Sequence, residues 1–163
     1  MKISEYISEE VARQGHNIHA VDGAIRVGWM TQAWEWAQAE SKSSRLPTVS
    51  HIREIGRMIE PIKNDPERSL NGFRSVGVRV GDRICCRPED VLPRLLHLWE
   101  FLDSIPGLGA VGALTFYKEF ELIHPFVDGN GRTGKILLNW LTGTLDAPVF
   151  PPDDLWGEPI RNP

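Results

Sequence analysis

The chain has 163 residues, 41% of them hydrophobic, and a formal net charge of -4 at pH 7, so it can bury one sizeable core and is most simply interpreted as a single domain. The acidic balance argues against a general nucleic-acid-binding protein, and the sequence has neither an apolar run of membrane-spanning length nor a charged-then-apolar leader after Met1. We therefore expect a cytoplasmic protein without a membrane or nucleic-acid partner, in agreement with the adjacent Cys85 and Cys86, which are unsuited to a fold-stapling disulfide.

Residues 1–46 are predicted to form a helical arm. Residues 3–20 have a weak helical pattern that a Gly-His-Asn turn interrupts. His16 and His19 lack the neighbouring cysteine or carboxylate pattern of a metal site, so we interpret both as surface histidines. Residues 25–37 carry large apolar side chains at helical spacing. This stripe is typical of a helix that packs on a core, although the arm as a whole is also a candidate regulatory segment.

Two further helices are predicted in the middle of the chain. A polar connector ends at Pro47, and apolar side chains then recur at helical spacing over residues 49–62 until prolines interrupt the pattern. Residues 88–102 begin with a proline and two acidic residues, which favour the first turn of a helix. We assign both helices to a core region, residues 47–145, followed by an extended proline-rich tail over residues 146–163.

Between these two helices the hydrophobic period changes to two, which is typical of strands. The alternating residues of the first strand are Val76, Gly77, Val78, Arg79 and Val80. Gly81-Asp82 is a two-residue turn signal, and residues 84–86 supply a short return strand. An isolated hairpin is marginal unless it packs on something else, and its free edge can pair with an extended peptide. We predict one β-hairpin, either as a peptide-binding edge or as a purely structural element.

The most informative segment runs from His124 to Lys135, between two predicted core helices. Apolar residues recur at three- and four-residue steps before it, over residues 113–123, and after it, over residues 136–141. The Gly129-Asn130-Gly131 loop can adopt positive-φ conformations that turn several backbone N–H groups toward one point. The second helix then begins with free donors and the positive end of its dipole at that point. The segment therefore predicts an anion site that suits a triphosphate.

Four side chains of this segment have chemistry that suits phosphate transfer. Asp128 is a hard anionic ligand that can hold a magnesium ion together with phosphate oxygens. Arg132 can grip phosphate oxygens with a bidentate fork, and Lys135, about one turn further on, is expected to point the same way. His124, with an unperturbed pKa of about 6.5, suits a neutral imidazole that accepts a proton from a hydroxyl.

Other interpretations of the loop explain less. A solvated turn between two core helices accounts for the glycines, but it leaves the coincidence of base, carboxylate and cations unexplained. An EF-hand requires further ligands and a terminal glutamate, which do not follow Asp128. A Walker A loop requires a different glycine spacing and a preceding strand. We therefore predict a phosphate-transfer site.

Residues 124–132 resemble the signature of the Fic family, His-x-Phe-x-(Asp/Glu)-Gly-Asn-Gly-Arg-x-x-Arg. Only the last fixed position differs, where this chain has Lys135. Gly72-Phe73-Arg74 is similar to the Gly-x-(Tyr/Phe)-Arg pattern that leads into the family's β-hairpin flap. The resemblance, which covers about residues 49–145, implies a mainly α Fic fold. That fold is a helical bundle with the signature loop between two core helices and one β-hairpin flap.

The resemblance also implies a Mg²⁺-dependent protein adenylyltransferase, a nucleotidyltransferase that moves AMP from ATP to a Ser, Thr or Tyr hydroxyl of a target protein. In this sequence, His124 would be the catalytic base, Asp128 would hold the Mg²⁺ ion, and Arg132 would bind the departing pyrophosphate. The residues expected to bind the nucleotide phosphates are Gly129, Asn130, Gly131, Arg132 and Lys135. The residues expected to position the target on the flap are Arg74, Val76, Gly77, Val78 and Val80.

The resemblance suggests a regulatory residue as well. Many Fic proteins carry a (Ser/Thr)-x-x-x-Glu-(Gly/Asn) helix whose glutamate occupies the γ-phosphate pocket. Thr31 to Glu35 match the first part of this pattern, with Trp36 in place of the small residue. One hypothesis is that Glu35 reaches Lys135 or Arg132 and restrains the enzyme. The alternative is an exposed glutamate on a core helix, with a separate antitoxin-like inhibitor or none.

Lys135 keeps other functions open. In the family, the arginine at its position contacts the γ-phosphate and pairs with the inhibitory glutamate, whereas a lysine offers a point charge in place of a fork. The alternatives to AMP transfer are a Doc-like protein kinase, another nucleotidyl or phosphate transferase, and a non-catalytic module that binds a peptide or a nucleotide. His124 favours an enzyme because simple anion binding requires no base.

Overall fold

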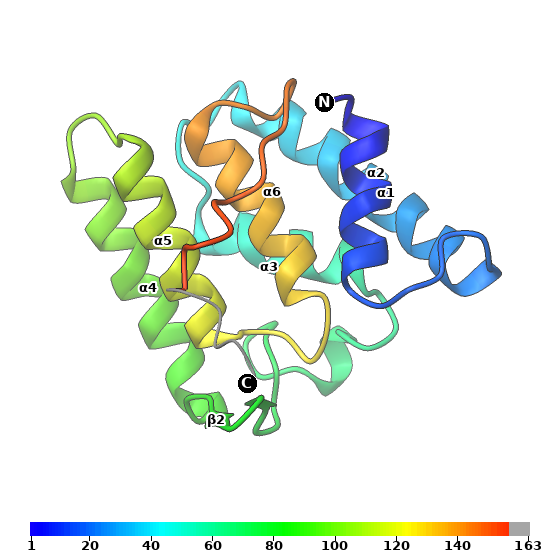
Figure 1. The fold of residues 1–163 in the computed structure, drawn as a ribbon. Helices are drawn as coiled ribbons and strands as arrows, with labels where there is room; N and C mark the ends of the chain where they lie inside the picture. The colour runs from blue at the N-terminus through cyan, green and yellow to red at the C-terminus, as the bar shows by residue number, and fades with distance from the viewer. Residues whose placement is uncertain (157–163) are drawn as a thin grey trace, which may run out of the picture.

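The computed structural model describes residues 1–156, which fold into six α-helices and one two-stranded hairpin (Figure 1). The elements in chain order are α1 (Ile3–Arg13), α2 (Val21–Ser41), α3 (Val49–Ile59), a 3-10 turn η1 (Pro66–Arg68), β1 (Arg79–Val80), β2 (Arg83–Ile84), α4 (Pro88–Ser104), α5 (Ala110–Ile123) and α6 (Asn130–Thr142). The mainly α fold with a single hairpin, predicted from the sequence, is confirmed. The predicted tail is described only as far as Trp156, and residues 157–163 lie outside the described part.

Helix α6 lies at the centre of the bundle and packs against α2, α3 and α5, and α4 packs on α5 (Figure 1). Every residue of α6 from 132 to 140 is buried. A helix that is buried on all sides belongs in the middle of a core rather than at its surface. The loop that precedes α6 ends at the first turn of this helix, so this end of the loop is fixed against the bundle.

The N-terminal arm joins the same core. Tyr6 of α1 stacks on Phe150 with ring centroids 4.0 Å apart, and its hydroxyl donates to Val149 O at 2.9 Å. Trp34 of α2 donates from Nε1 to Leu145 O at 2.9 Å. Helix α1 is thereby held between α2 and the segment that follows α6. Its C-terminal end lies over the start of α6, where the signature loop ends.

Helix α3 begins with a capping box, in which Thr48 Oγ1 accepts a hydrogen bond from His51 N, and His51 Nδ1 accepts one from Thr48 N at 3.0 Å. It ends at Ile59, earlier than the predicted residue 62, because a proline at position 61 disfavours helical backbone in the residue before it. Glu60 is therefore the C-cap of α3, and its side chain is only 1% exposed.

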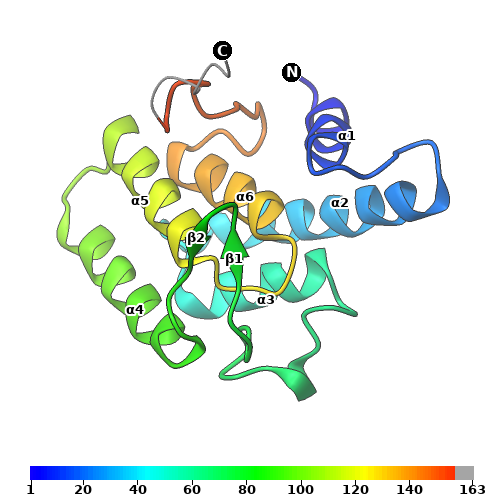
Figure 2. The ribbon, with the colours of Figure 1, turned by 60° about the horizontal axis from the view of Figure 1, so that its bottom comes forward.

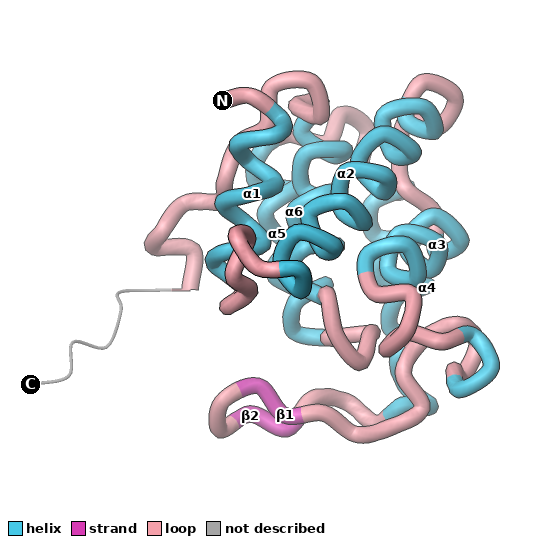
Figure 3. Tube along the Cα trace, turned by 90° about the vertical axis from the view of Figure 1, so that its right-hand side faces the viewer, coloured by secondary structure: helices cyan, strands magenta, loops and turns pink. Residues whose placement is uncertain are grey.

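The β-hairpin is shorter than predicted. Its strands pair Arg79 with Ile84 and Val80 with Arg83, and one more backbone hydrogen bond joins Cys85 N to Val78 O at 3.1 Å. The hairpin crosses in front of the signature loop (Figure 2) and projects from the helical bundle (Figure 3).

Val76 and Gly77, which were predicted to begin the first strand, lie before it. The carbonyl of Val76 accepts a hydrogen bond from the Arg74 guanidinium at 3.0 Å, so it is not available to a partner strand. Gly77 has no side chain to pack, and a β-carbon built there would have no atom of a non-neighbouring residue within 4 Å. The paired part of the hairpin is thus confined to its tip.

Within residues 1–156, no helix combines the length and the apolar content that crossing a membrane requires. Cys85 and Cys86 both carry free thiols, as their adjacency led us to expect.

Candidate functional site

The signature loop begins where α5 ends. His124 is the C-cap of α5 and has left-handed backbone geometry, with φ 52° and ψ 63°, which is uncommon for a residue other than glycine. The chain then turns so that the Phe126 ring, only 1% exposed, packs on Phe73 at a centroid distance of 5.5 Å. A side chain at Gly56 of α3 would collide with this ring. The buried ring fixes the loop on the core and leaves His124 half-buried at its edge.

Arg74, at the base of the flap, holds the backbone around His124. Its side chain is 1% exposed and donates from Nε to His124 O at 2.6 Å, and from Nη2 to Ile123 O at 3.1 Å and Cys86 O at 2.7 Å. Its backbone N–H also donates to Pro125 O at 2.9 Å. One guanidinium therefore joins both ends of the flap to the turn that carries the predicted base. This role was not expected for Arg74, which was predicted to position the target.

The environment of His124 favours a neutral imidazole. Burial lowers the pKa of His124 and is the largest cause, and a hydrogen bond with the Glu121 backbone opposes it. The positive charges of Arg74 and Arg83 lower the pKa further, against a smaller opposing effect of Asp128, and the net pKa is lowered. The ring is therefore unprotonated at neutral pH, as a general base requires.

Asp128 is held in place by two residues that follow α3. Lys63 Nζ lies 2.8 Å from Asp128 Oδ2, and the Asn64 side chain donates to Asp128 O at 2.9 Å and accepts from Asp128 N at 3.3 Å. Burial alone would raise the pKa of Asp128, but the hydrogen bonds from Lys63 and from Gly129 N outweigh it, and the net pKa is lowered. The carboxylate is therefore ionised and fixed, as a ligand for a hard cation should be.

The N-terminus of α6 has no side-chain cap. Gly129 is its N-cap, with φ 79°. The side chain of Asn130 accepts a hydrogen bond from Phe126 N at 2.9 Å and donates one to Phe126 O at 3.0 Å, so it shapes the loop. We had expected this side chain to bind phosphate. Only the backbone N–H groups of the first turn, with the positive end of the helix dipole, remain for an anion.

Arg132 is buried beside the loop in a pair with Glu60. Its Nη2 lies 2.9 Å from Glu60 Oε1 and 3.7 Å from Asp128 Oδ1, and the side chain is 1% exposed. Its Nε and Nη1 are buried and have no hydrogen-bond partner among the described residues. Buried donors are rarely left unpaired in a folded protein. These two groups are therefore candidate donors to a ligand oxygen.

Lys135 does not point the same way as Arg132, contrary to our expectation. Its Nζ lies 3.1 Å from Glu10 Oε1 of α1 and 5.3 Å from the centre of the Tyr117 ring. Burial would lower the pKa of Lys135, but Glu10, Tyr117 and Glu121 raise it, and the net pKa is raised. The ammonium group is thus charged and engaged by α1 on a different side of α6.

The end of α1 also contacts the first turn of α6. The side-chain amide of Gln14, just after α1, lies so close to Gly131 that a β-carbon there would collide with it. The same amide donates to Glu10 Oε1 at 2.7 Å. One end of α1 therefore lies against the start of α6, with Gln14 beside Gly131 and Glu10 paired with Lys135.

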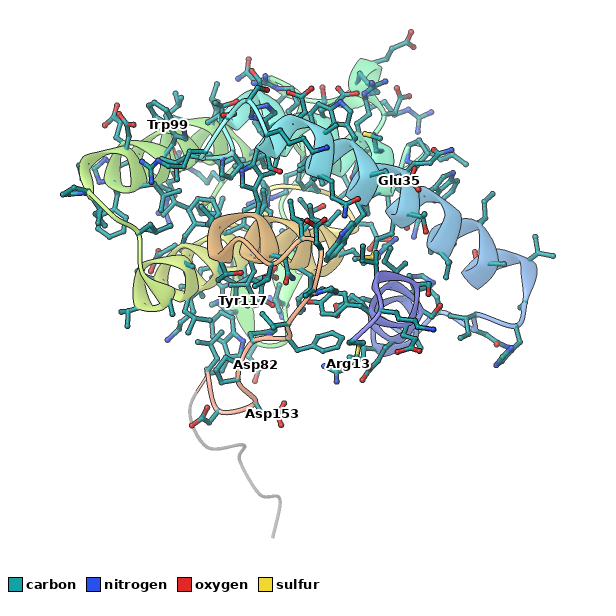
Figure 4. All side chains as sticks on the ribbon, turned by 90° about the horizontal axis from the view of Figure 1, so that it is seen from above. Arg13, Glu35, Asp82, Trp99, Tyr117 and Asp153 are labelled. Carbon is teal, nitrogen blue, oxygen red and sulfur yellow. The ribbon has the colours of Figure 1, made fainter. Side chains whose placement is uncertain are left out.

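The prediction that Glu35 reaches the loop cations is wrong for this structure. Glu35 is exposed on α2 (Figure 4), and the two cations pair with Glu10 and Glu60 instead. Thr31 donates its hydroxyl to Val27 O of its own helix at 2.7 Å. The physical reason is that Glu35 falls on the outer face of α2, whereas the buried face presents Met30, Ala33 and Trp34 to the core.

Glu121 is a further acid behind the loop, partly buried, with its Oε1 atom fully buried. Burial raises its pKa to about 8, and its Oε1 has no hydrogen-bond partner among the described residues. It lies against Gly134 of α6, where a β-carbon would collide with it. Tyr117, labelled beside α6 in Figure 4, occupies the same region. At neutral pH this carboxyl is largely protonated.

The site has the groups that a Mg²⁺–nucleotide substrate requires. Ligand atoms of His16, Glu60 and Asp128 lie within 4.8 Å of one another. Glu60 is fully buried between Arg26 and Arg132, whereas Asp128 is partly exposed beside the exposed Lys63, so Asp128 is the more accessible carboxylate for a hard cation. The unpaired donors of Arg132 and the α6 N-terminus fit phosphate oxygens.

Sequence reasoning missed Glu10, Glu60, Arg26, Lys63 and Asn64. Glu10 carried a signal, because it falls among Tyr6, Ile7 and Val11 on the buried stripe of α1. A charged residue in an apolar stripe indicates a buried ion pair. Arg26 carried the same signal, because it lies on the buried stripe of α2 with Met30 and Ala33. The other three had no comparable signal, since they follow the end of α3 in a connection whose course the sequence does not reveal.

Comparison with known proteins agrees with this geometry. A sequence model described as the Fic/DOC family matches residues 46–142. A protein named protein adenylyltransferase fic-1, from Caenorhabditis briggsae, is 31% identical over 116 residues, which make up 69% of this chain and 22% of that protein. Protein adenylyltransferase Fic from Nematostella vectensis is 31% identical over 125 residues, or 68% of this chain and 26% of the relative. The chain thus spans about a quarter of the length of these relatives.

A solved structure has the same fold. A Fic family protein from Desulfovibrio desulfuricans G20 superposes with a TM-score of 0.59 and 20% identity, over 85% of this chain and 45% of that one. The family's sequence model covers more than half of the chain, including α3, the hairpin, the signature loop and all of α6. On that match, the chain belongs to the Fic/DOC family.

Proposed function

We propose that this protein is a Mg²⁺-dependent protein adenylyltransferase, which transfers AMP from ATP to a Ser, Thr or Tyr hydroxyl of a target protein. One observation carries the proposal. A neutral, half-buried His124 lies at one end of a short loop, and the other end offers an uncapped helix N-terminus and the unpaired donors of Arg132. Simple anion binding would need the second feature but not the first. The names of the relatives support the same activity.

The reaction follows from these groups. His124 takes the proton of the target hydroxyl while the hydroxyl oxygen forms a bond to the α-phosphorus. The bond from the α-phosphorus to the oxygen that bridges the α- and β-phosphates breaks, and pyrophosphate leaves. Arg132 and the first N–H groups of α6 stabilise the charge that moves onto the departing phosphates. A Mg²⁺ ion held by Asp128 would neutralise phosphate charge and orient the substrate.

The hairpin is the candidate surface for the target. Its paired strands are short, and Val80 and Ile84 are 43% and 72% exposed. An extended segment of the target can add to a free strand edge through backbone hydrogen bonds. Because Arg74 joins the flap to the His124 backbone, a segment bound there would be registered against the base.

The activity can be tested with ATP labelled on either the α- or the γ-phosphate. Purified protein, Mg²⁺ and cell lysate should give protein-bound label from the α-phosphate only, and the His124→Ala variant should give none. Label from the γ-phosphate alone would make the protein a kinase. No transfer of either label would leave the binding module as the better description.

We also propose that α1 restrains the enzyme, in the role first considered for Glu35. Glu10 is 1% exposed and pairs with Lys135, and Gln14 packs against Gly131, so the end of α1 lies against the first turn of α6. We infer that ATP occupies this turn fully only when the end of α1 moves. The Glu10→Gln variant keeps the shape of the side chain and removes the charge. We expect it to modify proteins about tenfold faster, which corresponds to the loss of one charge-assisted contact.

Glu9 provides the matched control for this variant. It is the neighbouring residue of α1, partly exposed, and pairs with Arg13 on the same helix. The Glu9→Gln variant should therefore modify proteins at the wild-type rate. Equal rates for both variants would show that α1 does not restrain the enzyme, and a separate, antitoxin-like inhibitor would become the better hypothesis.

A further inference from the structure

Arg26 of α2 lies outside the part of the chain that matches the family, yet it belongs to the same buried cluster as Arg132. Its Nε lies 2.7 Å from Glu60 Oε1, and its Nη2 lies 3.5 Å from Glu60 Oε2. Arg132 Nη2 contacts the same Oε1 at 2.9 Å. Two guanidinium groups therefore meet at one carboxylate, and the exposed fractions of the Arg26, Arg132 and Glu60 side chains are 9%, 1% and 1%.

The two arginines use Glu60 differently. Arg26 spans both carboxylate oxygens, and its Nη1 is held in turn by Asp22 O at 3.1 Å and by the Asp22 carboxylate. Arg132 reaches only one oxygen, through one nitrogen. This single contact leaves Nε and Nη1 of Arg132 without partners. Those two N–H edges are the donors that the proposed function assigns to the phosphates.

A carboxylate that is not otherwise engaged prefers to bind a guanidinium through two parallel hydrogen bonds. If Arg26 did not hold Glu60, the carboxylate could turn to take Arg132 in this bidentate way. The second bond would use either Nε or Nη1 of Arg132, because Nη2 is already engaged. One of the two donors would then be lost to the nucleotide.

We propose that Arg26 is a positioning residue for polyphosphate binding, which acts through Glu60 to keep two N–H edges of Arg132 free. The inference rests on the proposed function, because it concerns the same phosphate site. It also supplies a reason for the position of Arg26 in the arm. Burying two guanidinium groups and a carboxylate carries a large desolvation cost, and apolar side chains would tie α2 to α3 without it.

The test is the affinity for inorganic pyrophosphate with Mg²⁺, measured by isothermal titration calorimetry in the full chain. Two variants preserve the net charge of the cluster. Arg26→Lys keeps the positive charge but cannot hold both oxygens of Glu60. The double variant Arg26→Met/Glu60→Gln removes one charge of each sign, and a glutamine cannot take Arg132 in a bidentate carboxylate pair. All proteins are measured with and without Glu10→Gln, so that α1 does not mask the site.

We expect Arg26→Lys to weaken pyrophosphate binding about tenfold, as the loss of one charge-assisted hydrogen bond would. The double variant should stay within about threefold of the wild-type affinity, because Arg132 keeps its free edges. If Arg26 acted only as a positive charge, or only held α2 and α3 together, Arg26→Lys should weaken pyrophosphate binding less than the double variant does. The Arg57→Lys variant, which alters an exposed pair with Glu54 on α3, is the control and should bind normally.

Wild-type affinity in Arg26→Lys, or weaker binding in the double variant than in Arg26→Lys, would overturn the inference. A crystal structure of Arg26→Lys gives a readout without ligand, in which both Glu60 oxygens should contact Arg132, and a retained single contact would also overturn it. If Arg26→Lys does not fold, the double variant decides by the same threefold criterion. If the wild type transfers AMP and both variants bind pyrophosphate with wild-type affinity, only this inference is overturned. Absence of any pyrophosphate or ATP binding would remove the proposed function as well.

Discussion

The two ends of the signature loop differ in how completely their polar groups are satisfied. At the histidine end, Arg74 gives its hydrogen bonds to backbone carbonyls of the flap and of the turn, and His124 is left half-buried and neutral. At the helix end, Arg132 has two buried donors without partners, and α1 lies over the first turn of α6. The base is therefore in place before substrate binds, whereas the phosphate site has the end of α1 packed against it, which we propose restricts access. Access of the nucleotide, rather than assembly of the base, is the step that this fold can control.

The largest effect should come from breaking the histidine end. Arg74→Met would leave up to four backbone carbonyls without their donor, those of His124, Val76, Cys86 and Ile123. Unpaired buried carbonyls destabilise a protein by about 1–3 kcal/mol each, and partial access of water reduces the sum to about 3–4 kcal/mol. Urea unfolding measures this loss, and AMP transfer should fall even where the variant is fully folded.

Arg87→Met is the control for this change. Arg87 lies directly after Cys86, is exposed, and pairs with Asp90 in the first turn of α4. Its loss should change the free energy of unfolding by less than about 0.5 kcal/mol. If Arg74→Met unfolds at the same urea concentration as Arg87→Met, the guanidinium does not hold the flap and the turn together.

The second effect concerns the partly buried acid behind the helix end. The pKa of Glu121 is raised from 4.5 to about 8 by burial, so the folded protein binds a proton that the unfolded chain has lost between these pH values. Stability from this group is fully present below pH 4.5 and is lost as the pH rises through about 8. Glu121→Gln should abolish this dependence and should be more stable than the wild type at pH 9, by roughly 1–3 kcal/mol.

Thermal melts from about pH 5 to about pH 9 check this expectation, because this range covers most of the interval in which stability should fall. The Glu119→Gln variant, two residues earlier on α5, is the control and should follow the wild type. Parallel curves for the wild type and Glu121→Gln would show that the carboxyl is not the group that titrates.

The smallest effect should sharpen the description of the base. Because the pKa of His124 is lowered, the acid limb of the pH profile for AMP transfer should lie below that of an ordinary histidine. Arg83 contributes to this lowering, so Arg83→Met should move the limb to higher pH. The shift should be small because Arg83 is exposed and its field is screened by solvent. Arg79→Met, on the other strand of the hairpin, should leave the limb in place.

The sequence predicted the parts of the site that one short segment encodes. The helices on both sides of the loop follow from apolar spacing, and the loop follows from its glycines and from the residues that flank them. The hairpin was predicted in the right place but too long, because Val76 alternates correctly with its neighbours although its carbonyl is bonded to Arg74. Alternation reports which side chains can share a face, and it does not report which backbone groups are already engaged.

Contacts between distant segments were not predictable in the same way. Glu10 and Lys135 are 125 residues apart in the chain, and their pairing depends on how α1 lies across α6. Glu35 was chosen because it fits a pattern, but the pattern does not say which face of α2 is buried. Likewise, Lys135 lies one turn beyond Arg132, yet the two side chains leave α6 toward different neighbours. Sequence spacing fixes positions along a helix, whereas packing decides which partner each side chain meets.

The most direct test of the central claim is the affinity for MgATP of the wild type, Glu10→Gln and Glu9→Gln, measured by isothermal titration calorimetry in the His124→Ala background so that no turnover occurs. If α1 closes the phosphate site while the histidine end is already formed, Glu10→Gln should bind MgATP about tenfold more tightly than the wild type. Glu9→Gln should match the wild type. Equal affinity in all three proteins would contradict the claim that α1 controls access of the nucleotide.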